Sequence, residues 1–275
     1  MTRRLVLAAC LTACAHAAGA ADYQILAVRY ASSPQFPLSN LVMGAPAEEK
    51  VDIALAFWVV RGGGHTLLID AGFHRQHWFE RFRITDYVRP DEALKPLGIK
   101  PEDVTDIAIS HAHWDHLGGI DLFPKANVWI QKREYEYYTG EAWQPGGRKG
   151  GIDPEDILAL VKANTEGRLR LIDGDDVEFL PGIRAYTGAR HTYASQYFRV
   201  EGPPAFVFAS DNCYLYRNLE ARAASATFSE ADRPGNIAAQ ARMIELAGAR
   251  ERVVPGHDPQ QFTRFPAEGR VARIR

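Results

Sequence analysis

Cysteine is scarce in this chain, which has only three cysteines among 275 residues. Two of them, Cys10 and Cys14, lie near the amino terminus, so only Cys213 belongs to the body of the chain. One thiol cannot form an internal disulfide. The sequence therefore excludes a secreted domain held together by disulfides.

Blocks of one charge are also absent. The chain has 32 Lys and Arg residues against 34 Asp and Glu residues, and the two signs are interspersed. Such a pattern offers no basic surface for nucleic acid or for an anionic membrane, so we expect neither as a partner. Linkers of low complexity and short repeats are missing after residue 22. We expect residues 21–275 to form a single domain with room for a large core.

The only long apolar stretch lies at the amino terminus, within MTRRLVLAACLTACAHAAGAAD. Two arginines, a short apolar run and small residues predict a secretory signal peptide over residues 1–20 and no transmembrane span. We therefore expect export to the periplasm or secretion. The segment LTAC at 11–14 also resembles a lipoprotein box, so a lipid anchor at Cys14 is the alternative to soluble export.

Short runs rich in Val, Ile, Phe and Tyr, bounded by Gly, Asp or Pro, predict strands. They lie at 24–30, 53–60, 66–70, 106–110, 127–131, 168–172, 177–180, 183–187, 196–200, 205–210 and 252–254. Helices are predicted at 91–97, 132–138, 153–163 and 236–247, the third opening with Asp153 and Pro154. This order favours an α+β fold of stacked sheets covered by helices. The glycine-rich segment 140–151 is expected to be a loop over the site.

The segment SHAHWDHLGG holds three of the nine histidines, at His111, His113 and His116, together with Asp115. A random chain of this composition would contain the pattern HxHxDH on the order of 10⁻³ times, so the motif is specific. His111 and His113 are two apart after a predicted strand and should point the same way. Imidazole nitrogens suit zinc and other first-row metals, and the added carboxylate supports a second ion.

Three further polar residues follow other predicted strands: His191, Asp211 and His257. A single histidine at the end of a strand is usually only hydrogen-bonded. Residues in loops beside a rigid sheet are, however, where sites are commonly built. Together with HxHxDH, the three favour one metal site at the edge of the sheets.

The order of these motifs resembles the metallo-β-lactamase superfamily over nearly all of residues 50–262, including the turn at Asp70 and Gly72. The segments SHAHWDHLGG, ASDNCY and PGHDPQQF are most similar to its N-acyl homoserine lactonases, the quorum-quenching branch. The resemblance implies a four-layer αβ/βα sandwich with the metals at one edge. It also implies a dinuclear metal-dependent hydrolase, zinc being the expected ion, that opens a lactone or related ester.

The resemblance also assigns roles to individual residues. A hydroxide shared by the two metals would attack the carbonyl, Tyr214 would donate to the oxyanion, and Asp115 or Asp211 would handle the proton. The implied metal ligands are His111, His113 and His191 for the first ion, Asp115, His116 and His257 for the second, and Asp211 as the bridge.

Other functions within the superfamily stay open at this point, namely an exported β-lactamase or thioester hydrolase and a metal protein without hydrolytic activity. A β-lactamase is expected to carry a residue other than aspartate at position 211. The segment TGARHTYASQ departs from the family pattern, because Arg190 and Tyr193 stand where relatives have glycine and proline. The loop beside His191 is thus expected to be bulkier and more polar.

Residues outside this set receive simpler predictions. Asp70 is expected to hydrogen-bond a ligand histidine or its loop. Cys213 is expected to be a small buried thiol, and His65 an exposed turn residue. For the aromatic segment REYEYYTGEAW at 133–143, a place in the core is favoured over a wall of the substrate cleft.

Overall fold

The computed structural model describes residues 22–275, so the predicted signal peptide and Cys14 lie outside the described part. An eight-stranded sheet has the order β12-β13-β1-β2-β3-β4-β5-β6, and a five-stranded sheet has the order β11-β10-β9-β8-β7. The strands of the first sheet are β1 (Gln24–Pro37), β2 (Lys50–Gly62), β3 (His65–Ile69), β4 (Asp106–Ala108), β5 (Asn127–Gln131), β6 (Leu169–Ile172), β12 (Ala267–Glu268) and β13 (Val271–Arg273). The second sheet contains β7 (Val177–Leu180), β8 (Ile183–Thr187), β9 (Gln196–Val200), β10 (Phe206–Ser210) and β11 (Val253–Pro255).

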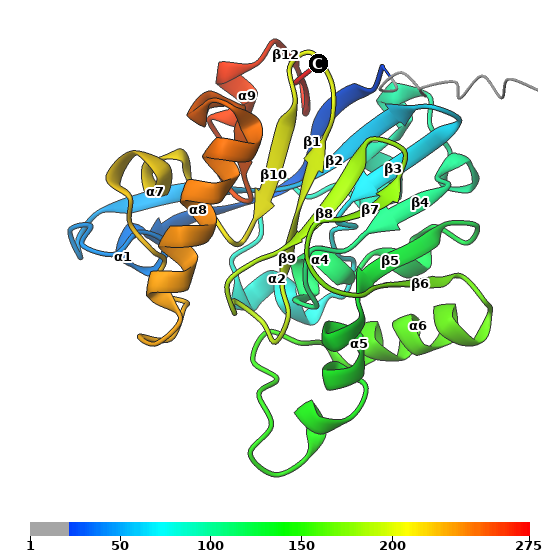
Figure 1. Cartoon of the computed structure of the whole chain (residues 1–275), viewed down its shortest axis with the longest axis horizontal. Coiled ribbons are helices and arrows are strands. Elements are labelled where there is room, and N and C mark those ends of the chain that lie inside the picture. Colours follow the sequence, from blue (N-terminus) through cyan, green and yellow to red (C-terminus); the bar gives the residue numbers. More distant parts are fainter. Residues whose placement is uncertain (1–21) are drawn as a thin grey trace, which may run out of the picture.

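The two sheets face each other, and helices cover their outer faces (Figure 1). The helices are α1 (Leu38–Leu41), α2 (His77–Arg81), α3 (Pro90–Ala93), α4 (Trp114–Leu117), α5 (Lys132–Tyr138), α6 (Pro154–Thr165), α7 (Tyr216–Ala221), α8 (Arg233–Ala247) and α9 (Gln261–Arg264). The long α8 lies along β10 on the outside of the smaller sheet, and α6 lies beside β6 (Figure 1). Within residues 22–275, no helix combines the length and apolar character needed to cross a membrane.

Alternating side chains of the long strands supply two different cores. Ile25 and Ala27 of β1 pack between the sheets with Phe198 and Phe208 of the smaller sheet. The intervening residues of β1, such as Leu26, pack instead under the helices outside the larger sheet. This alternation follows from the two-residue period of a strand, since successive side chains point to opposite faces. The layers are helix, sheet, sheet and helix, so the predicted α+β sandwich is confirmed.

Each predicted strand is present, and most lie within a few residues of their expected bounds, but β1 continues to Pro37 instead of ending at residue 30, and other elements differ as well. The predicted helix 91–97 is α3 followed by a separate 3₁₀ turn at Lys95–Leu97, because Pro96 has no amide hydrogen to continue an α-helix. The strands β12 and β13 were not predicted. They are very short, and β13 exists because β1 offers it an edge to pair with.

A close backbone contact holds the segment that follows the histidine motif. A Cβ atom on Gly119 would lie only 2.1 Å from the carbonyl oxygen of Ala71, so only glycine fits there. The amide of Ala71 also donates to the carbonyl of His116, at 2.8 Å. These contacts bring the end of β3, with Asp70, against the turn that carries His116.

Gly119→Ala is expected to lower the free energy of unfolding by about 1–3 kcal/mol, because the added methyl group forces the two backbones apart. Urea unfolding in the presence of a chelator measures this without a contribution from metal binding. Gly235→Ala is the control, since a Cβ there meets nothing within 4 Å in helix α8. Equal stability of the two variants would contradict the close contact.

Candidate metal centre

The candidate ligands lie at the carboxyl ends of strands from both sheets. β3 and β4 are parallel neighbours in the larger sheet, and β10 and β11 are parallel neighbours in the smaller one. The HxHxDH segment follows β4 and enters α4, while His191, Asp211 and His257 follow β8, β10 and β11. The structure therefore brings together all seven residues that the sequence suggests as ligands, although they span 147 positions from 111 to 257.

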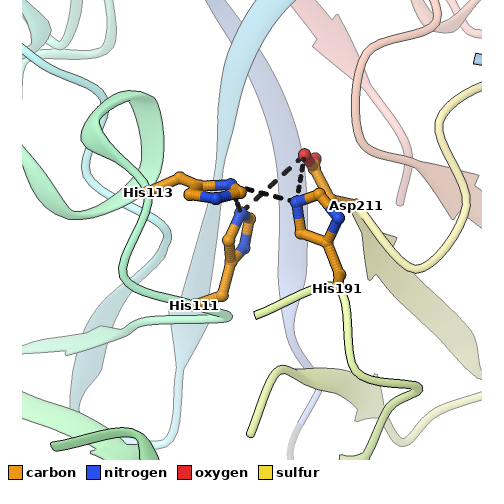
Figure 2. A group of neighbouring side chains, drawn as sticks. All are labelled: His111, His113, His191 and Asp211. Carbon is orange, nitrogen blue, oxygen red and sulfur yellow. Dashed lines mark hydrogen bonds and ion pairs between the residues drawn. The ribbon is translucent and has the colours of Figure 1, made fainter. Parts of the chain in front are cut away.

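Three imidazoles and one carboxylate form the first group (Figure 2). Nδ1 of His113 lies 3.0 Å from Nε2 of His111 and 3.0 Å from Nε2 of His191. Oδ2 of Asp211 lies 3.2 Å from Nε2 of His191 and 3.8 Å from Nε2 of His111. All four side chains point at one spot.

Asp115, His116 and His257 form the second group. Oδ2 of Asp115 lies 3.5 Å from Nε2 of His116 and 3.7 Å from Nε2 of His257. Oδ1 of Asp211 faces the same two nitrogens, at 3.3 Å and 2.9 Å. One oxygen of Asp211 thus faces each group, which is the position that a bridging carboxylate would need.

Both groups fit divalent metal ions. Nitrogen ligands placed tetrahedrally around zinc at 2.0–2.1 Å lie about 3.3 Å apart, close to the spacing of the first group. Nε2 of His116 and Oδ1 of Asp211 are buried atoms without a hydrogen-bond partner, which a cation would satisfy. The donors are imidazole and carboxylate only, a set that suits zinc and also manganese, iron and cobalt.

Most ligand histidines are held by a hydrogen bond on the ring nitrogen that faces away from the site. Asp70 binds Nδ1 of His116 at 2.8 Å, which confirms its predicted contact with a ligand histidine. Ser110 lies 2.9 Å from Nδ1 of His111, and the carbonyl of Ala54 lies 2.9 Å from Nδ1 of His257. Such partners fix the orientation and tautomer of a metal-binding imidazole.

The charges of the buried site affect metal binding differently in the two groups. Burial holds the pKa values of His111 and His113 well below the usual range, so these imidazoles are neutral. Burial alone would lower the pKa of His116, but Asp115 and Asp211 raise it well above the usual range. Burial would likewise raise the pKa of Asp211, but His257 and His116 hold it well below, so this carboxylate is ionised. A metal in the second group must therefore displace protons.

Tyr214, the expected donor to the oxyanion, lies beside both groups. Its hydroxyl is 3.5 Å from Nε2 of His191, and its ring stacks on His257 with a centroid distance of 5.6 Å. Burial, followed by the charge of Asp211, raises its pKa well above the usual value. The phenol therefore keeps its proton and can act as a donor at neutral pH.

A cavity of about 380 Å³ opens over the site. Its apolar walls come mainly from β1, β2, the segment after α2 and the start of α4. Besides the candidate metal ligands, the cavity is lined by the apolar side chains of Phe36, Leu41, Ile53, Leu55, Phe82, Ile84 and Trp114. Such a cavity suits a small molecule with an apolar substituent.

Glu134 on α5 is a functional residue that the sequence did not reveal. Its side chain is fully buried and accepts three hydrogen bonds, from the amides of Ala112 and Ala194 and from the hydroxyl of Thr192. Ala112 separates His111 from His113, and Thr192 follows His191. Glu134 therefore ties together the two loops that carry the first group. The only sign of its importance in the sequence was its position, as a carboxylate among tyrosines near the start of a predicted helix.

Other predictions have mixed outcomes. His65 was wrongly predicted to be exposed: it is partly buried, and its Nδ1 lies 2.9 Å from Asp106 because it begins β3 beside β4. Cys213 is buried, as predicted. In the aromatic segment, Tyr137 and Tyr138 are buried as core residues, yet both also line a second cavity beside the site.

Glu134→Gln is expected to weaken metal binding about 10–100-fold, because its amide group turns a donor toward partners that are themselves donors. Competition against a chromophoric chelator measures the affinity. Glu136→Gln, on the exposed side of the same helix, is the matched control. Wild-type metal affinity in Glu134→Gln would show that this carboxylate does not position the ligands.

Comparison with solved structures agrees with the observed layers. An N-acyl homoserine lactone hydrolase with the product N-hexanoyl-L-homoserine bound at its catalytic metal centre superposes with a TM-score of 0.71. It is 19% identical, and the match covers 88% of this chain and 95% of that one. AidC, a dizinc quorum-quenching lactonase, gives a TM-score of 0.65 at 16% identity over 92% of this chain and 94% of that one. At these identities the likeness establishes the fold.

Sequence relatives extend the comparison. N-acyl homoserine lactonase AttM of Azorhizobium caulinodans is 30% identical over 229 residues, covering 76% of this chain and 83% of that protein. N-acyl homoserine lactonase AiiB of Agrobacterium fabrum is 25% identical over 228 residues, covering 77% of this chain and 82% of that protein. The sequence model of the metallo-beta-lactamase superfamily matches residues 54–203. The chain belongs to the metallo-beta-lactamase superfamily.

Proposed function

We propose that this protein is a metal-dependent hydrolase that opens the ester bond of a lactone, using two zinc ions held by the candidate centre. The observation that carries the proposal is the position of Asp211, which turns one oxygen toward each ligand group and lines the apolar cavity together with Tyr214. Relatives AttM and AiiB are N-acyl homoserine lactonases, so acyl homoserine lactones are the first substrates to test.

Different residues of the chain would have different roles in ester hydrolysis. The two ions, when bound, supply Lewis acidity for the carbonyl and lower the pKa of a water molecule to provide the nucleophile. Tyr214, whose hydroxyl lies 3.5 Å from Nε2 of His191, would donate a hydrogen bond to the oxygen on which negative charge develops. The apolar side chains around the cavity pack against the apolar part of the substrate and exclude water.

Opening the ring also requires a proton for the departing alkoxide. Asp115 and Asp211 both line the cavity, with side chains 11% and 6% exposed. Asp115 is the more accessible of the two, so we assign it the transfer to the departing oxygen of the proton that the attacking water gives up. Asp211 then remains between the two groups throughout.

A substrate panel tests the proposal: acyl homoserine lactones of graded chain length, simple γ- and δ-lactones, an aryl ester and a carbapenem. We expect the zinc-loaded protein to open the lactones and His113→Ala to lose that activity, because its ring nitrogen contacts both other imidazoles of the first group. Turnover of the carbapenem without turnover of any lactone would contradict the proposal and favour a β-lactamase.

Tyr214→Phe is expected to lower kcat by roughly 100-fold, since a donor to a developing oxyanion typically contributes about 3 kcal/mol. The metal content should not change, because phenylalanine keeps the ring that stacks on His257. Tyr216→Phe removes a buried hydroxyl without a partner, on α7, and serves as the control. An unaltered kcat in Tyr214→Phe would remove the phenol from the mechanism.

A further inference from the structure

A second cavity, of about 530 Å³, lies beside the first ligand group and is lined in part by His113 and His191. His113, His191 and Gly150 line both this cavity and the apolar one. Figure 2 shows the two imidazole rings, those of His113 and His191. Both cavities are therefore adjacent to the first ligand group. The second cavity has no function in the mechanism described above.

The lining of this cavity is polar, in contrast to the apolar one. No aliphatic side chain larger than that of Ala231 takes part. The remaining wall comes from α5, the loop at 140–151, the loop around His191 and the start of α8: Tyr137, Tyr138, Glu141, Gly146, Arg148, Arg190, Thr192, Tyr193, Ser229 and Asp232. An alkyl chain would bury little apolar surface here, so this space suits a polar substituent.

Two arginines give the cavity its chemical preference. Within residues 22–275, no carboxylate lies within ion-pair distance of the guanidinium of Arg148 or of Arg190. Arg190 lies over the ring of Tyr193, 5.0 Å from its centroid, and Tyr193 in turn stacks on Tyr137 at 4.0 Å. The stacked rings of Tyr193 and Tyr137 thus support the guanidinium of Arg190, and its N–H groups are not used in an ion pair with a carboxylate of the described residues. A guanidinium is always charged, and its planar donors match a carboxylate.

The acidic residues of the same wall do not cancel this preference. Asp232 accepts from the hydroxyl of Ser229, so part of its acceptor capacity is used locally. Glu141, Arg148 and Arg190 are all exposed in the loops that line this cavity, and Glu141 makes no ion pair with either arginine. Neither carboxylate pairs with Arg148 or Arg190, so both guanidinium groups are available to a ligand.

We propose that the second cavity binds a carboxylate on the substrate, which makes this enzyme selective for lactones that carry a free carboxylate at the end of their acyl substituent. The proposal rests on the proposed lactone hydrolysis. Arg148 and Arg190 act as specificity residues, and they recognise the anionic end while the ring lies at the metals. The departure of Arg190 and Tyr193 from the family pattern then has a physical consequence, since Arg190 supplies one of the two guanidinium groups and Tyr193 supplies the ring beneath it.

Homoserine lactones acylated with succinate, glutarate or adipate provide the test, each compared with its neutral terminal amide. We expect kcat/KM of the wild-type enzyme to favour at least one carboxylate over its amide about tenfold or more. Arg148→Ala and Arg190→Ala should each lower that ratio toward one, mainly through KM. Arg148→Ala is the more informative variant, because Arg190 directly precedes the candidate ligand His191 whereas no candidate ligand lies next to Arg148 in the sequence.

Lys149→Ala is the matched control, because it removes a positive charge next to Arg148 from a residue outside the cavity wall. Its ratio should equal that of the wild type, and metal content is measured for every variant. Equal kcat/KM for acid and amide across the series would overturn this proposal and leave lactone hydrolysis standing. Failure to open either form, or any neutral acyl homoserine lactone, would overturn both proposals.

Discussion

The buried carboxylate of Asp70 is the contact on which the geometry of the metal centre depends. It accepts hydrogen bonds from the amide and hydroxyl of Ser110, from Nδ1 of His116 and from the hydroxyl of Ser210. These partners stand at the ends of β4 and β10 and in α4, so one side chain joins both sheets to the histidine motif. A carboxylate without solvent requires such compensation, and it fixes its partners in return.

Glu134 has the equivalent role on the other side of the centre. Asp70 orients a histidine of the second group, whereas Glu134 connects the loops of the first group through Ala112 and Thr192. The contact of Gly119 with Ala71 brings β3 close enough for Asp70 to reach His116. Both ligand groups are therefore held in place by the protein itself, which is what a metal centre with strict ligand geometry needs.

Much of this arrangement could be predicted from sequence because its signals are local. Asp70, His191, Asp211 and His257 each follow an apolar run, and a strand end is visible in a single stretch of chain. Glu134 could not be predicted, because its partners lie 22, 58 and 60 residues away and two of them are backbone amides. The pairing of β13 with β1 is also a long-range contact. His65 was misjudged for the same reason, since Asp106 lies on another strand.

The two cavities beside the metal centre differ in polarity. An apolar space and a polar space both border His113 and His191, and the proposed specificity depends on this difference in their character. Specificity then depends on the loops that line these spaces, whereas the ligands and their supports belong to the sheets. This division allows the substrate to change while the chemistry at the metals is kept.

Metal titration of the depleted protein tests the central claim most directly. Zinc is added in steps while lactone hydrolysis and bound metal are measured on the same samples. Two ligand groups sharing Asp211 predict no hydrolysis without metal and a maximum at about two equivalents per chain. Full hydrolysis in the depleted protein, or a maximum at one equivalent, would contradict a dinuclear centre.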